Sequence, residues 1–134
     1  MEISKILPLL AVFILAFVLT AFGRSVSNAV IVTKDDNGKE ISIPQGGIVE
    51  IRQEYPAGTG YSWEITDMDK SLLELLDVTT KPIKEGPVAG GPILKTWRIK
   101  AVGKGETELK MYYYRVWEGL EKAPDKFLLR IRIS

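Results

Sequence analysis

A strict alternation of apolar and polar side chains near the end of the chain constrains the fold more than any other feature. The last ten residues place four apolar side chains at every second position: Phe127, Leu129, Ile131 and Ile133. Residues 106–116 repeat this pattern with Leu109, Met111 and Tyr113 in phase. Since successive side chains of a β-strand point to opposite faces of a sheet, both segments are predicted to be half-buried strands.

Several upstream segments show the same period of two. Residues 47–54 alternate two sets of side chains, so one face is expected to be buried and the other to face solvent: Val49, Ile51 and Gln53 against Ile48, Glu50 and Arg52. Residues 93–102 place five side chains in one phase: Ile93, Lys95, Trp97, Ile99 and Ala101. Residues 61–65 put Tyr61, Trp63 and Ile65 on one face. Residues 70–80 are ambiguous, because SLLELL fits one helical turn whereas LDVTT favours extended structure.

The start of the folded part is predicted to be a hairpin. Residues 29–34 form a β-branched run, and residues 39–44 form a second run that Pro44 ends. Asp35–Gly38 lie between them, and Asn-Gly favours the positive φ angles of a type I′ turn. About seven or eight short strands with regular turn signals indicate an all-β, immunoglobulin-like antiparallel β-sandwich.

The N-terminal segment is predicted to lie outside this domain. Residues 6–22 carry no charge and follow Lys5, which is typical of a secretory signal. An uncleaved membrane anchor is the alternative, since 17 helical residues span roughly 26 Å, near the lower limit for a bilayer. We therefore expect residues 1–29 to direct export, with cleavage after Gly23 or Ala29. Residues 30–134 then form one extracellular or cell-surface domain.

Composition excludes several kinds of function. The chain has no cysteine and no histidine, so disulfides, thiolate nucleophiles, imidazole bases and the usual zinc ligand sets are ruled out. The balance of 18 Lys+Arg against 17 Asp+Glu gives no basic excess for binding nucleic acid. We expect a monomer with no enzymatic activity, no metal and no cofactor. A membrane contact is expected only if residues 6–22 remain as an anchor.

Three connections between the predicted strands are unusually irregular. They are the B–C loop at residues 55–61, the D–E loop at residues 84–92 and the F–G loop at residues 114–124. In an immunoglobulin-like sandwich the B–C and F–G loops share one end, and an up-and-down succession brings the D–E loop to that end as well. The sequence therefore predicts one loop surface built from all three.

The motifs in these loops resemble those of the chagasin-like inhibitors of papain-family cysteine peptidases. The matching stretches are TGYSW at 59–63, the pair Gly90-Gly91 upstream of TWRIKA, and RVW at 115–117 before the final FLLRIRI. The family patterns are Asn-Pro-Thr-Thr-Gly-Tyr-x-Trp, Gly-x-Gly-Gly and Arg-Pro-Trp. This chain departs from them at three positions: Tyr55, Val88 and Val116.

The resemblance implies a function and a set of contact residues. It implies a reversible competitive inhibitor whose three loops occlude the cleft of a papain-family cysteine peptidase, with Thr59 and Gly60 nearest the catalytic cysteine. The implied inhibitory contacts are Thr59, Gly60, Tyr61, Gly90, Gly91, Arg115 and Trp117. Arg115 either holds its loop or pairs with the enzyme. Glycine permits close backbone approach, because it has no Cβ to collide with the groove.

Other interpretations of the same residues stay open at this point. Pro and Gly are ordinary turn formers, so the B–C loop alone also fits a plain turn. Trp63 and Trp97 lie in alternating strands and are expected in the core, whereas Trp117 follows a strand and is expected to contact a partner. The same loop surface would serve an extracellular adhesion or carbohydrate-binding module. An immunoglobulin-like accessory domain anchored by residues 6–22 is a third possibility.

Overall fold

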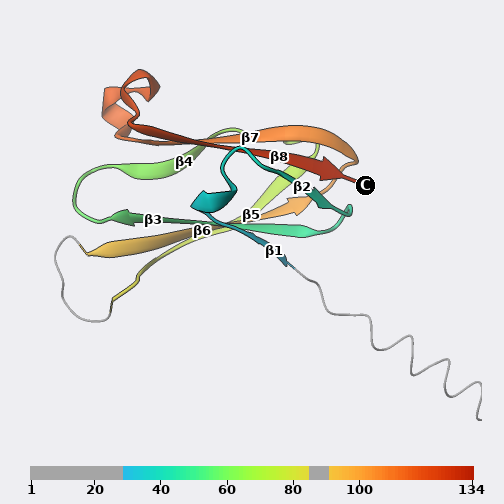
Figure 1. Cartoon of the computed structure of the whole chain (residues 1–134), viewed down its shortest axis with the longest axis horizontal. Helices are drawn as coiled ribbons and strands as arrows, with labels where there is room; N and C mark the ends of the chain where they lie inside the picture. Colours follow the sequence, from blue (N-terminus) through green and yellow to red (C-terminus); the bar gives the residue numbers. More distant parts are fainter. Residues whose placement is uncertain (1–28, 85–90) are drawn as a thin grey trace, which may run out of the picture.

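The computed structural model describes residues 29–84 and 91–134 (Figure 1). Within these residues the chain forms eight strands: β1 (Ala29–Val32), β2 (Glu40–Ile43), β3 (Ile48–Pro56), β4 (Ser62–Asp67), β5 (Leu73–Pro82), β6 (Pro92–Ala101), β7 (Gly105–Tyr114) and β8 (Asp125–Ile133). The same residues include three single-turn 3₁₀ helices: η2 (Lys34–Asp36), η3 (Val116–Glu118) and η4 (Leu120–Lys122). The all-β prediction is confirmed.

The strands form two four-stranded sheets packed face to face, seen as the lower and upper layers of Figure 1. The first sheet has the order β1-β3-β6-β5, and the second has the order β2-β8-β7-β4. Four of the six strand pairings are antiparallel, as predicted for an immunoglobulin-like sandwich. The edge strands β1 and β2 instead join β3 and β8 in parallel.

The predicted core faces are confirmed. Fifteen apolar side chains are buried between the sheets: Val32, Ile43, Val49, Ile51, Trp63, Leu73, Trp97, Ile99, Ala101, Leu109, Met111, Phe127, Leu129, Ile131 and Ile133. Trp63 and Trp97 are only 7% and 2% exposed, so both belong to the core as expected. Gln53 is buried in phase with its apolar neighbours on β3.

The predicted hairpin over residues 29–44 is wrong. The two strands that flank Asp35–Gly38 lie in different sheets. Asn37 has φ −57°, whereas a type I′ turn needs positive φ at both central residues, and only Gly38 provides it with φ 80°. Asn37 instead docks the crossover on β8. Its side chain accepts a hydrogen bond from Leu128 N–H at 2.9 Å and donates one to Lys126 O at 3.3 Å.

The ambiguous segment 70–80 is mainly extended. A short turn precedes β5, and the Asp69 carboxylate closes it by accepting hydrogen bonds from Ser71 Oγ at 2.6 Å and Ser71 N at 2.9 Å. These bonds hold the pKa of Asp69 below its usual value. The strand β5 then runs along the open edge of the first sheet, with a register shift between Leu75 and Asp77. Pairing with β6 therefore stabilises the extended conformation of this segment over the helical turn.

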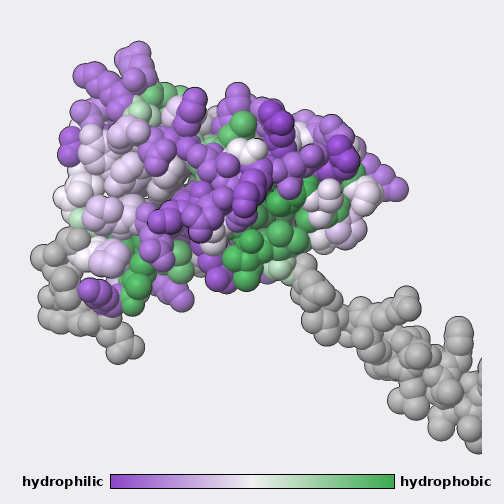
Figure 2. Space-filling model, viewed as in Figure 1, coloured by the Kyte–Doolittle hydropathy of each residue, from purple (hydrophilic) through white to green (hydrophobic). Residues whose placement is uncertain are grey.

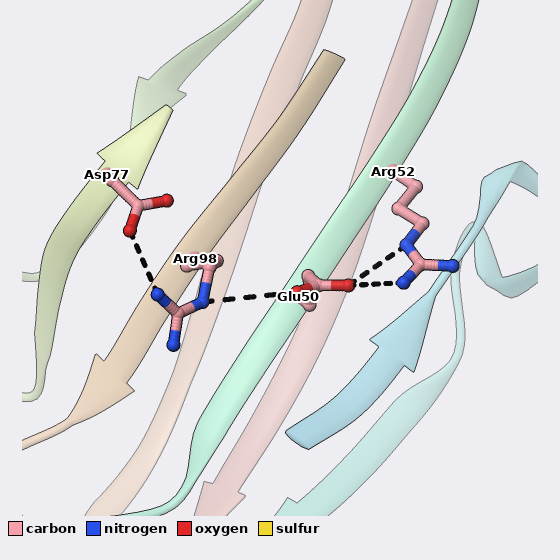
Figure 3. Close-up of polar contacts among 4 residues, drawn as sticks. All are labelled: Glu50, Arg52, Asp77 and Arg98. Carbon is pink, nitrogen blue, oxygen red and sulfur yellow. Dashed lines mark hydrogen bonds and ion pairs between the residues drawn. The ribbon is translucent and has the colours of Figure 1, made fainter. Parts of the chain in front are cut away.

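Four charged side chains cross the outer face of the first sheet in alternating sign (Figure 3). Arg98 on β6 donates to Asp77 on β5 at 3.0 Å, and its Nε lies 3.9 Å from Glu50 on β3. Arg52 Nε donates to the same Glu50 carboxylate at 2.9 Å. Exposed single pairs contribute little, but this connected row links three adjacent strands and keeps each charge beside an opposite one.

The export segment predicted at residues 6–22 lies outside the described residues. In the described part of the chain, no helix has the length and apolar character needed to cross a bilayer. The strand β1 begins at Ala29, which pairs with Ile48.

Candidate functional site

The described ends of three strand connections lie at one end of the sandwich, at the left of Figure 1 and opposite the C-terminus. They join β3 to β4, β5 to β6 and β7 to β8. Strand register brings the first two connections together, because Pro56 at the end of β3 pairs with Pro92 at the start of β6. The Ala57 N–H also donates to Gly91 O at 3.0 Å, which ties the first connection to the second. Gly90 and Val88 lie outside the described residues.

The β3–β4 connection owes its shape to two glycines. Gly58 and Gly60 have φ angles of +83° and +82°, a region that side chains with a Cβ rarely adopt. Between them, the Thr59 hydroxyl accepts a hydrogen bond from the Tyr61 N–H at 3.1 Å. The chain therefore reverses direction over very few residues and presents Thr59 at the tip.

Aromatic side chains root this loop in the sandwich. Tyr113 on β7 lies at the centre, with its ring 5.3 Å from Tyr61, 5.4 Å from Trp63 and 6.0 Å from Tyr55. Such separations are typical of favourable aromatic pairs. Burial, with Glu64 and Tyr113 nearby, raises the pKa of Tyr55. The aromatic cluster thus places large side chains beside the turn that contains Gly58 and Gly60.

The β7–β8 connection packs against the tip of the β3–β4 connection. Arg115 Nε donates to Thr59 O at 2.9 Å, and its guanidinium lies 4.3 Å from the Tyr61 ring. Trp117 lies on η3 and is 73% exposed. A Cβ built on Gly60 would lie 2.5 Å from Cη2 of Trp117, so the tryptophan ring occupies the space that a side chain at Gly60 would need.

The β7–β8 connection exposes three large apolar side chains beside charged ones. Val116, Trp117 and Leu120 are 65%, 73% and 44% exposed. Sequence reasoning identified Trp117 but gave no role to Leu120, although VWEGL contains three large apolar residues in a predicted loop. Figure 2 shows that the loop end is mostly of intermediate hydropathy, whereas strongly hydrophilic side chains cross the middle of the same face. An exposed tryptophan amid other apolar side chains is a common anchor in protein interfaces.

A polar contact beneath the loops connects the two sheets. Lys95 on β6 donates to Glu64 Oε1 at 2.9 Å and to Trp63 O at 3.1 Å, both on β4. Ser62 Oγ donates to the same Glu64 oxygen at 3.0 Å. The Lys95 side chain is only 12% exposed. Its inward phase was visible in the sequence, but sequence reasoning assigned it no function.

The structure thus brings together five of the seven predicted contact residues: Thr59, Gly60, Tyr61, Arg115 and Trp117. Gly91 lies at the end of the D–E loop beside Ala57, and Gly90 is not described. In residues 29–84 and 91–134, no cluster of three acidic, histidine or cysteine side chains could hold a metal ion. Fold and loops define a small β-sandwich with a projecting, internally packed loop end.

A comparison with protein families identifies this module. Residues 42–131 match the family described as Chagasin family peptidase inhibitor I42. The chain belongs to the chagasin family of peptidase inhibitors, as its sequence motifs predicted. No curated protein sequence matches the chain.

Solved structures share the fold. The cysteine protease inhibitor EhICP2 from Entamoeba histolytica superposes with a TM-score of 0.71 and 22% identity, covering 79% of this chain and 96% of its own. Amebosin superposes with a TM-score of 0.69 and 23% identity, covering 81% of this chain and 100% of its own. PbICP-C, solved in complex with falcipain-2, superposes with a TM-score of 0.51 and 21% identity. The match covers 81% of this chain and 91% of PbICP-C. At these identities the similarity establishes the chagasin-like β-sandwich.

Proposed function

We propose that the protein is a reversible, competitive inhibitor of papain-like cysteine peptidases, with no catalytic activity of its own. It occludes the active-site cleft with residues 55–61, 84–92 and 114–124. Family membership supports inhibition of peptidases, and PbICP-C supports the class of target because its structure contains falcipain-2. The observation that carries the proposal is the packing of Trp117 against the Thr59-Gly60 tip.

The geometry of this tip suits a narrow groove. An inhibitor must place backbone against the floor of the cleft without presenting a peptide that the enzyme can cut. The tight reversal at Gly58 and Gly60 keeps the chain from running extended through the groove. Thr59 and Gly60 then lie over the catalytic cysteine, and the exposed Trp117 covers apolar surface on one flank. Rigid strands hold these loops, so little conformational entropy is lost on binding.

One sequence-based expectation about Gly60 is changed by the structure. The missing Cβ at Gly60 is expected from the sequence to avoid a collision with the groove of the enzyme. The Cβ position instead faces the ring of Trp117. The absence of a side chain at Gly60 thus serves packing within the inhibitor, and a substitution there acts on the enzyme through Trp117.

Inhibition assays with papain and a fluorogenic peptide test the proposal. Purified protein should raise the apparent KM without changing kcat, and activity should return on dilution. Trp117→Ala should weaken inhibition by roughly 30- to 1000-fold, the usual loss for a buried tryptophan anchor. Arg130→Ala on β8, which breaks an exposed ion pair with Glu108, is the matched control and should inhibit like the parent. Equal inhibition by Trp117→Ala and the parent would refute the three-loop arrangement.

We propose further that residues 1–29 direct export, so that the inhibitor acts outside the cell or at its surface. The uncharged run at residues 6–22 supports this proposal. Cleavage after Gly23 would leave β1 complete, whereas cleavage after Ala29 would remove its first paired residue. Intact-mass measurement of the exported protein tests the proposal. A membrane-bound species that retains residues 6–22 would instead support an anchored inhibitor.

A further inference from the structure

Arg115 is in contact with both loops of the described tip. Its Nε–H donates to Thr59 O at 2.9 Å, which lies in the β3–β4 connection. Its guanidinium lies 4.3 Å from the centre of the Tyr61 ring and 6.0 Å from that of Trp117. Its Nη1 lies 3.6 Å from the Glu118 carboxylate in the same connection as Trp117.

These contacts extend an aromatic stack from the core to the surface. Buried Trp63 packs on Tyr113, Tyr113 stacks on Tyr61 at 5.3 Å, and Tyr61 lies against the Arg115 guanidinium. The guanidinium in turn lies beside the exposed Trp117 ring. The planar guanidinium of arginine can stack on aromatic rings, whereas the compact ammonium group of lysine cannot stack in this way. The Arg115 guanidinium therefore links the exposed Trp117 ring to the aromatic rings that reach the hydrophobic core.

We propose that Arg115 is a positioning residue that joins the β3–β4 and β7–β8 connections into one rigid unit, and that it is not an ionic contact to the enzyme. The inference rests on the proposed inhibition but concerns the loops of the free protein. The Arg115 side chain is 33% exposed, its charge lies near Glu118, and its Nε is bonded to Thr59. Its role is to keep Thr59 and Trp117 in the arrangement that fits the groove.

Arg115→Ala should then reduce the population of binding-competent loops. If that population falls to a tenth, the apparent inhibition constant rises by about tenfold. Arg115→Lys separates the two roles, because lysine keeps the charge but cannot bond Thr59 O while lying flat on Tyr61. A positioning role predicts that lysine weakens inhibition as much as alanine does. An ionic contact predicts that lysine retains inhibition. Arg130→Ala serves as the control, because it also removes an arginine, but on β8 and not in the loops.

Amide hydrogen exchange gives a readout that does not depend on any enzyme. In Arg115→Ala and Arg115→Lys, exchange of the Tyr61 N–H, which donates to the Thr59 hydroxyl, should speed up by at least about tenfold, while exchange in β7 and β8 stays unchanged. Unchanged exchange at the loop, or full inhibition by Arg115→Lys, would overturn the proposal. If the parent fails to inhibit papain, the proposed function fails, and the exchange rates still decide the role of Arg115. Circular dichroism of each variant verifies that it folds.

Discussion

Replacing Gly60 with alanine adds one carbon where the β3–β4 connection meets Trp117. The new Cβ would lie 2.5 Å from Cη2 and 3.1 Å from Cζ2 of the ring. The ring must retreat by about 1 Å to reach an ordinary carbon–carbon contact distance. Because the ring is 73% exposed, it can move outward without opening the core. The loss in unfolding free energy should therefore be only the strain of a non-glycine residue at φ +82°, about 1–2 kcal/mol.

The affinity for the enzyme should fall as well, because Trp117 no longer lies where the loops place it. Inhibition of papain should weaken by at least about tenfold, up to the loss caused by Trp117→Ala. In the Trp117→Ala background there is no ring to displace, so Gly60→Ala should add no more than about twofold. The double-mutant cycle should thus give a coupling energy of about 1 kcal/mol or more.

Gly46→Ala is the matched control for backbone strain. Gly46 also has positive φ, +89°, but nothing lies within 4 Å of its Cβ position. It should lose a similar unfolding free energy in urea and retain the parent inhibition constant. Equal fold losses from Gly60→Ala in both Trp117 backgrounds would refute the packing argument. A loss of stability far greater than in Gly46→Ala would show that Trp117 is held more firmly than its exposure indicates.

Three further substitutions test the scaffold. Trp63→Ala should lose about 3–5 kcal/mol of unfolding free energy, because it removes a buried ring, and a melting temperature close to that of the parent would contradict its core role. Asn37→Ala should lose about 1–2 kcal/mol in urea unfolding, because Leu128 N–H and Lys126 O lose their partner; no loss would mean that water replaces it. Tyr55 has a raised pKa, so its neutral form stabilises the fold below the unfolded value of 10.0, and this contribution is lost as pH rises through the folded value. The free energy of unfolding should decrease more across this alkaline range for the parent than for Tyr55→Phe.

The strands were predictable because burial leaves a direct trace in the sequence. Leu109 and Met111 on β7 are fully buried, as their alternation required. The inward phase even included Gln53 and Lys95, whose polar groups argue against burial when taken alone. Lys95 satisfies its inward position by bonding Glu64 and Trp63 O across the sheets. The alternation of side chains thus predicted the face to which each one points, but not its hydrogen-bond partners.

Sheet membership of the first two strands was not predictable from local pattern. Asn37-Gly38 has the composition of a type I′ turn, and nothing within residues 29–44 conflicts with a hairpin. The alternative depends on partners far along the chain, since Asn37 bonds residues of β8 that lie 89 and 91 positions away. β1 and β2 both pair with parallel neighbours, and a local turn signal carries no information about such long-range pairings.

Local sequence is equally uninformative about the loop in which Val116 replaces the proline of the family pattern. In that pattern, proline lies between arginine and tryptophan. Proline fixes φ and so restricts a loop, and Val116 lacks that restriction. In this structure other interactions hold the segment. Glu118 N–H donates to Arg115 O at 2.9 Å to close η3, and the Glu118 carboxylate lies 3.6 Å from the Arg115 guanidinium. Since the guanidinium also bonds Thr59 O, the turn is fixed both within its own loop and against its neighbour. The conformation that proline would impose locally is here maintained by contacts of Arg115, and for this reason Val116→Pro should change inhibition much less than Arg115→Ala does.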